Sequence, residues 1–90
     1  MGAPFQLRVL NPKHVVFDGQ VESVFLPGDA GEFELLAYHV PIMSLLRDGE
    51  IVIDWKTRIP IRKGMVRYHN EECVILLEEK RERMVKKAEH

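Results

Sequence analysis

Turn-forming residues interrupt this chain at short intervals, and that feature limits what the chain can fold into. Clusters of Gly, Pro, Asn and Asp recur roughly every 6–12 residues, at Asn11-Pro12, Asp18-Gly19, 27–31, Pro41, 47–49 and Asn70-Glu71. Glycine and proline disfavour the interior of a helix, and the segments between the breaks are shorter than an ordinary helix. Short segments with frequent turns are typical of β-sandwiches and barrels.

The apolar residues between these turns mostly alternate with polar ones, as in strands that bury one face. We expect strands at 5–10, 15–17, 20–26, 33–36, 42–46, 51–55, 58–62, 65–69 and 73–77. The pattern therefore predicts an all-β chain, a flattened β-sandwich or barrel of about 8–10 short strands.

Three local signals refine this prediction. Asp18-Gly19 lies between apolar runs and predicts a tight hairpin, because glycine adopts positive φ without steric cost. Lys56-Thr57 predicts a second hairpin. Pro60 has no amide hydrogen to donate, which predicts an edge position at that point of its strand.

The composition changes near residue 78. Residues 79–90 contain no glycine or proline, and Glu79 precedes Arg83 at the favourable i,i+4 spacing for a helix. We therefore expect a β-sandwich domain over residues 1–78, followed by a short charged helical tail over 79–90. The tail has two interpretations, the natural end of a short protein or the first part of a longer helical region.

The apolar strand residues are expected to form the core, and no other function is expected of them. They are Val9, Val16, Phe17, Val24, Leu26, Phe33, Leu35, Ile53, Trp55, Val74 and Leu76. Cys73 is the single cysteine, so an internal disulfide is excluded. Its apolar neighbours predict a buried and unreactive thiol.

Composition and motifs argue against several functional classes. The net charge is −1, whereas nucleic-acid binding needs a concentrated basic surface. The four histidines lie far apart with no paired-cysteine motif, so we expect no metal site. Without a phosphate loop or a nucleophile elbow, we expect no cofactor, no small-molecule substrate and no enzymatic activity. Because no apolar run approaches the ~20 residues of a membrane span, membrane contact is expected only through a partner.

A longer pattern lies in residues 31–49. It consists of Gly31, Glu32, His39, Pro41 and Gly49. Their spacing resembles the signature of the N-terminal β-sandwich domain of the epsilon subunit of F-type ATP synthases. Residues 7–24 are similar to the opening strands of that domain, and the resemblance extends over about residues 5–77.

The resemblance implies a structural role rather than a catalytic one. The epsilon subunit is a rotor subunit that couples the gamma subunit of the central stalk to the membrane c-ring during proton- or sodium-driven ATP synthesis. The implied partners are gamma and the c-ring, with the beta subunit as a further candidate. The implied location is the cytoplasmic face of a bacterial inner membrane, as a peripheral protein. Most members continue into an inhibitory helical hairpin, which is not seen here, so a short form with little or no inhibitory function is expected.

The resemblance also implies two contact regions by position. The loop expected at the c-ring consists of Gly28, Asp29, Ala30, Gly31 and Glu32, whose carboxylates suit arginine partners. The residues expected to face gamma are Asn11, Tyr38, His39 and Ser44. The alternatives are a loop that is merely solvated and a histidine that is satisfied within its own fold.

Three glycine positions of the family differ in this chain. Glu34 and Tyr38 each stand where the family has glycine, and a Ser-Gly-Gly segment is reduced to Arg62-Lys63-Gly64. Each lost glycine predicts a backbone that does not need positive φ there, or a turn that is built differently.

Two other functional hypotheses remain beside the rotor subunit. One is a stand-alone β-sandwich module that binds a small ligand or another complex. The other is a small lyase or isomerase, which no motif in the sequence supports.

Overall fold

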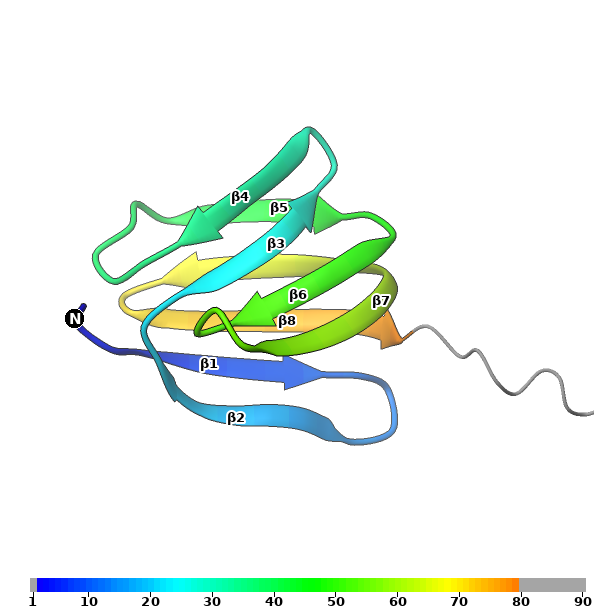
Figure 1. Cartoon of the computed structure of the whole chain (residues 1–90), viewed down its shortest axis with the longest axis horizontal. Helices are drawn as coiled ribbons and strands as arrows, with labels where there is room; N and C mark the ends of the chain where they lie inside the picture. The colour runs from blue at the N-terminus through cyan, green and yellow to red at the C-terminus, as the bar shows by residue number, and fades with distance from the viewer. Residues whose placement is uncertain (1, 80–90) are drawn as a thin grey trace, which may run out of the picture.

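The computed structural model describes residues 2–79, and these residues form strands joined by short turns (Figure 1). The strands are β1 (Phe5–Leu10), β2 (Val15–Val21), β3 (Val24–Gly28), β4 (Gly31–Leu35), β5 (Ile42–Leu46), β6 (Gly49–Ile53), β7 (Thr57–His69) and β8 (Glu72–Glu79). The all-β prediction is confirmed. Glu79, expected to open the tail, belongs to β8, and the rest of the predicted helical tail lies outside the described residues.

The strands form two layers that share the long strand β7. One layer has the order β2-β1-β8-β7-β5, and β3, β4 and β6 make up the other. The first part of β7 pairs with β6, whereas Gly64 to Tyr68 pairs with β5. On the far side, β3 meets β5 at Gly28 and Leu46, so the layers are joined at both edges. Pairing is antiparallel except between β1 and β8. Figure 1 shows β6 crossing in front of β8.

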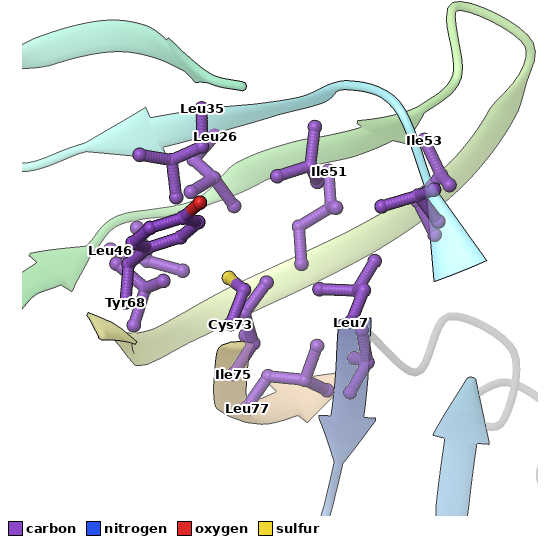
Figure 2. Packing of buried hydrophobic residues seen from close by; sticks show 14 of the residues in the cluster. Leu7, Leu26, Leu35, Leu46, Ile51, Ile53, Tyr68, Cys73, Ile75 and Leu77 are labelled. Carbon is purple, nitrogen blue, oxygen red and sulfur yellow. The ribbon is translucent and has the colours of Figure 1, made fainter. Parts of the chain in front are cut away.

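The core lies between the two layers and follows the alternation of each strand (Figure 2). Its buried members are Phe5, Leu7, Val9, Val21, Val24, Leu26, Leu35, Leu46, Ile51, Ile53, Ile61, Val66, Tyr68, Cys73, Ile75 and Leu77. Val16, Phe17 and Phe33 are partly buried against this cluster, so eight of the predicted core residues pack where expected.

Three predicted core residues lie elsewhere. In β8, Cys73, Ile75 and Leu77 face inward, so that Leu76 is exposed and Val74 is half-buried on the outer side. When both faces of a strand are apolar, the sequence does not show which residues point inward, because no polar residue identifies the outer face. Trp55 is exposed because it lies in the β6–β7 turn rather than in a strand.

The predicted Asp18-Gly19 hairpin is wrong. Both residues lie inside β2, opposite Arg8 and Leu7 of β1. The chain reverses earlier, at residues 11–14 between β1 and β2, where the Asn11 side-chain oxygen accepts the amide hydrogens of Lys13 and His14. An asparagine that bonds its own following backbone reverses the chain as effectively as Asp-Gly. The whole of β2 is then free to pair with β1.

The β6–β7 turn also differs from its prediction. Asp54 to Lys56 form the turn and Thr57 already belongs to β7. Asp54 adopts φ 51° and its carboxylate accepts the amide hydrogens of Glu22 and Ser23, which stabilises that conformation. The two strands predicted at 58–62 and 65–69 are one continuous strand, β7. Within it, Pro60 pairs with Glu50 of β6, and the pairing with β8 begins only at Ile61, as the edge prediction requires.

Cys73 is fully buried, which confirms the prediction for its surroundings. Burial raises the pKa of its thiol from 9.0 to about 12. At pH 8 the native thiolate fraction is then roughly 10³-fold below that of the unfolded chain. We expect a thiol reagent such as DTNB to label the native protein at least 100-fold more slowly than the protein in guanidinium chloride.

The same pKa predicts a pH dependence of stability. Below pH 9 both states hold the thiol proton, whereas between pH 9 and 12 only the unfolded chain releases it. The free energy of unfolding should therefore fall as the pH rises through this window, and Cys73→Val should remove that part of the fall. In the labelling experiment, rapid reaction of the native protein with DTNB at pH 8 would contradict the buried position of Cys73.

Candidate partner-binding surfaces

The β3–β4 hairpin contains the residues predicted at the c-ring. Only Asp29 and Ala30 lie between the strands, because Gly28 ends β3 and Gly31 and Glu32 begin β4. The predicted five-residue loop is thus a two-residue turn. Gly31 has φ 135°, a value that side-chain-bearing residues rarely adopt.

The base of this hairpin is held firmly. A Cβ at Gly28 would lie 2.7 Å from the Gly31 carbonyl oxygen and from the Phe33 ring, so the position has no room for a side chain. The Asp29 amide donates to the Leu45 carbonyl oxygen at 3.0 Å, and the Arg47 amide donates to the Pro27 carbonyl oxygen at 2.8 Å. The turn therefore presents the exposed Asp29 and Glu32 from a fixed base.

A row of apolar side chains crosses the outer face of the layer that contains β1, β8, β7 and β5. We call it the apolar strip, and it consists of Leu10, Leu76, Met65 and Leu45, which are successive partners in register. Leu45 is 60% exposed and Leu76 is 49% exposed. No strand among residues 2–79 covers this face. Large apolar side chains gathered on one sheet face are typical of interaction surfaces.

The strip borders a hollow of about 630 Å³. Its apolar lining includes all four residues of the strip, and Asn11, Asp29, Lys63 and Glu78 contribute polar groups. The hollow therefore joins the apolar strip to the β3–β4 turn. Asn11 and Asp29, predicted to meet different partners, lie at the same end of the sandwich.

The side chain of Asn11 is already engaged within the chain. Besides its oxygen contacts in the β1–β2 turn, its amide group donates to Glu79 Oε1 at 2.8 Å. Ser44 also has limited freedom, since it is half-buried opposite Val66 and its hydroxyl donates to the Leu45 carbonyl oxygen at 3.3 Å. Their contact with gamma remains a prediction.

Tyr38 and His39 lie at the other end of the molecule, in the loop between β4 and β5 beside the β7–β8 turn (Figure 1). Tyr38 is 78% exposed. The His39 ring packs edge-on against the buried Tyr68 ring, and its Nδ1–H donates to the Val40 carbonyl oxygen at 2.7 Å. The four residues predicted to face gamma are thus not gathered in one place. Asn11 lies at one end of the sandwich, Tyr38 and His39 lie at the other, and Ser44 lies within β5.

The three positions at which this chain lacks a glycine of the family differ in their backbone conformation. Tyr38 adopts φ 66°, so the first alternative, a backbone without positive φ, is wrong at this position, and the turn is built with positive φ on a residue other than glycine. Glu34 lies within β4 without positive φ, and its carboxylate accepts the Ser23 hydroxyl hydrogen. Gly64, the glycine that remains of the third segment, lies in the middle of the β7–β8 ladder.

Comparison with known proteins decides the family. The model of the family described as "ATP synthase, Delta/Epsilon chain, beta-sandwich domain" matches residues 4–82 of this chain. This chain belongs to that family. It is 36% identical over 75 residues to "ATP synthase epsilon chain 2" of Nitrobacter hamburgensis, a match that covers 80% of this chain and 55% of the relative. It is 34% identical over 77 residues to the ATP synthase epsilon chain of Sulfurimonas denitrificans, covering 81% and 59%.

Solved structures of the ATP synthase family share the fold. A chain in the central stalk and c-ring structure of the Tetrahymena thermophila mitochondrial enzyme superposes with a TM-score of 0.74 at 14% identity, covering 99% of this chain and 74% of that one. A chain of the Euglena gracilis mitochondrial enzyme gives 0.77 at 16% identity, covering 88% and 53%. The predicted family and fold are confirmed. This epsilon-type chain spans 55–60% of the length of the first four curated relatives.

Two further features, a metal-ion site and a membrane-spanning helix, were sought among the residues that the structure describes. Among residues 2–79, no three His, Cys, Asp or Glu side chains gather in a way that could hold a metal ion. The same residues contain no helix that is long and apolar enough to cross a membrane.

Sequence reasoning misses one residue that holds the Tyr38 loop in place, and this residue lies in the β7–β8 turn. The carboxylate of Glu71 accepts the Tyr38 amide hydrogen through both oxygens, at 2.9 and 3.1 Å. It also accepts the Tyr68 hydroxyl hydrogen at 3.0 Å. Burial, and then the Glu71 carboxylate, raise the pKa of Tyr68, which favours the protonated phenol as donor. Glu71 occurs in an Asn-Glu turn, and the sequence contains no sign that this turn reaches another loop.

Proposed function

We propose that this chain is a central-stalk rotor subunit of an F-type ATP synthase, which couples the gamma subunit to the membrane c-ring and has no catalytic activity of its own. The apolar strip is the observation that carries this proposal. A partner that covers Leu45, Met65 and Leu76 would remove from water apolar surface that residues 2–79 leave exposed. The names of the curated relatives, all ATP synthase epsilon chains, support the same assignment.

The charges around the strip define the partner surface further. Arg67 lies in the next row, between Met43 and Val74, and makes no ion pair with any residue of 2–79. An apolar partner surface that also offers a carboxylate would complement this face. We propose that gamma covers this face and supplies such a surface.

The β3–β4 turn suits the c-ring. Asp29 in the two-residue turn and Glu32 at the start of β4 are exposed carboxylates on a hairpin whose base is held by backbone hydrogen bonds, and arginine is their natural partner in charge-assisted hydrogen bonds. Because Asp29 also borders the hollow beside the strip, one rigid body would contact both partners at neighbouring sites. Such a body can transmit torque without changing shape.

The remaining parts of the proposal follow from this assembly. The chain would be peripheral at the cytoplasmic face of a bacterial inner membrane, held there by its partners, and the complex would be driven by protons or sodium ions. The beta subunit is a further candidate neighbour. We assign a mechanical role, and no inhibitory one, to the sandwich.

Binding to purified gamma subunit tests the proposal directly. We expect a 1:1 complex in gel filtration and calorimetry, and Leu45→Ser and Leu76→Ser should each weaken it about tenfold, because each removes a buried leucine from the interface. Trp55→Ser is the matched control, since Trp55 is 56% exposed but lies in the turn of the opposite layer. It should leave the affinity unchanged.

The outcomes separate the competing functions. Full affinity in both leucine variants would move the gamma site away from the strip. Failure of the well-folded wild type to bind gamma or an epsilon-depleted catalytic complex would overturn the rotor assignment and favour the stand-alone binding module.

A further inference from the structure

Two non-glycine residues with left-handed backbone are joined by a single carboxylate. Tyr38 in the β4–β5 loop has φ 66°, and Glu71 in the β7–β8 turn has φ 61°. The two residues are 33 positions apart in the chain, and the Glu71 carboxylate binds the Tyr38 amide through both oxygens. Residues other than glycine avoid this backbone region, so each conformation requires support from its surroundings.

The support at this point is extensive. The Glu71 carboxylate accepts the buried Tyr68 hydroxyl hydrogen, and Tyr68 packs edge-on against both Phe5 and His39. The backbone carbonyl of Glu71 accepts the Gln6 amide hydrogen at 3.0 Å. Glu71 is thus tied to the core and to β1, while its side chain reaches out to hold the neighbouring loop.

The consequence is an exposed aromatic side chain on a backbone that is held at its amide. Tyr38 is 78% exposed, although its backbone is bonded in place, and the exposed Leu36 and Val40 flank it in the loop. A tyrosine whose backbone is already held loses less conformational entropy when a partner covers it, because only its side-chain torsions remain to be fixed. Tyrosine is also one of the residue types enriched at binding hot spots.

We propose that Glu71 is the positioning residue of a second gamma contact, in which Tyr38 is the anchor. This inference rests on the function proposed above and adds a residue to it. Glu71 does not touch the partner. It acts by holding the Tyr38 backbone in the left-handed conformation that directs the ring outward.

The first test needs no partner. Hydrogen exchange of the Tyr38 amide, followed by NMR on the 90-residue chain, should be about tenfold faster in Glu71→Gln, because the amide loses one carboxylate acceptor. Glu72→Gln is the matched control, since it removes the same charge from the adjacent exposed residue, and it should leave the exchange rate unchanged. Equal protection of Tyr38 in wild type and Glu71→Gln would overturn the positioning role.

The second test measures affinity for gamma. We expect Tyr38→Ala to weaken binding about tenfold and Glu71→Gln about fivefold, with Glu72→Gln at the wild-type value. The double variant of Tyr38→Ala and Glu71→Gln should bind like Tyr38→Ala alone, because Glu71 acts through Tyr38. Additive losses, or no loss in Glu71→Gln despite faster exchange, would overturn the inference while leaving the rotor function intact. If wild type does not bind gamma, the rotor function and the anchor both fail, and the exchange result alone reports whether Glu71 holds the loop.

Discussion

Replacing Gly64 with alanine is expected to lower the free energy of unfolding by about 2–3 kcal/mol. A Cβ at this position would lie 2.6 Å from the Leu76 carbonyl oxygen and 3.2 Å from the Leu77 Cα. Both atoms belong to the backbone of β8, which pairs with β7 along its length and with β1 on its other side. The clash therefore cannot be relieved by rotation of a side chain, and two strand pairings must shift to accommodate it.

Chemical denaturation of Gly64→Ala and of a matched control measures this effect. Gly19 also lies inside a strand, but a Cβ there would meet only the Phe17 ring at 3.6 Å, an ordinary contact. Gly19→Ala should therefore be neutral or slightly stabilising, since alanine restricts the unfolded chain. Similar losses in the two variants would show that the close approach of β7 and β8 is not the cause.

Two adjacent residues of β8 should respond very differently to truncation. Ile75 is fully buried between the layers, whereas Leu76 is 49% exposed on the outer face. We expect Ile75→Ala to cost about 3 kcal/mol, the sum of lost burial and a residual cavity. Leu76→Ala should cost under about 1 kcal/mol in the isolated protein, because most surface substitutions have small effects.

This pair tests the register of β8, and it also separates stability from binding. A strand shifted by one residue would exchange the two effects, since every side chain would change face. Thermal and urea unfolding give the comparison. Leu76→Ala should in turn lower gamma affinity while Ile75→Ala, measured where it is still folded, should not. Equal losses of stability would contradict the two-layer arrangement at this point.

The proposed partner-binding surfaces were only partly predictable from the sequence. The β3–β4 turn was located by its glycines, and the structure adds that Asp29 borders the same hollow as the apolar strip. The strip was missed because Leu76 was assigned to the core, and Met65 and Leu45 carry no mark in sequence that separates an outward from an inward apolar residue. Glu71 was missed because its bond to Tyr38 joins loops that are adjacent only in the folded chain.

The sequence by itself determined the fold class, the family and most of the core. Frequent turn residues exclude helices over residues 2–79, and alternation identifies the buried face wherever polar residues mark the other one, as in Leu7 and Val9 of β1. Only the tertiary structure decided the register of β8, the continuation of β2 through Asp18-Gly19 and the left-handed conformation of Tyr38. In each case the deciding interactions join residues that are distant in sequence, either across a strand ladder or from Glu71 to its loop. Local patterns do not contain that information, because the energies that select among local alternatives arise only when the strands meet.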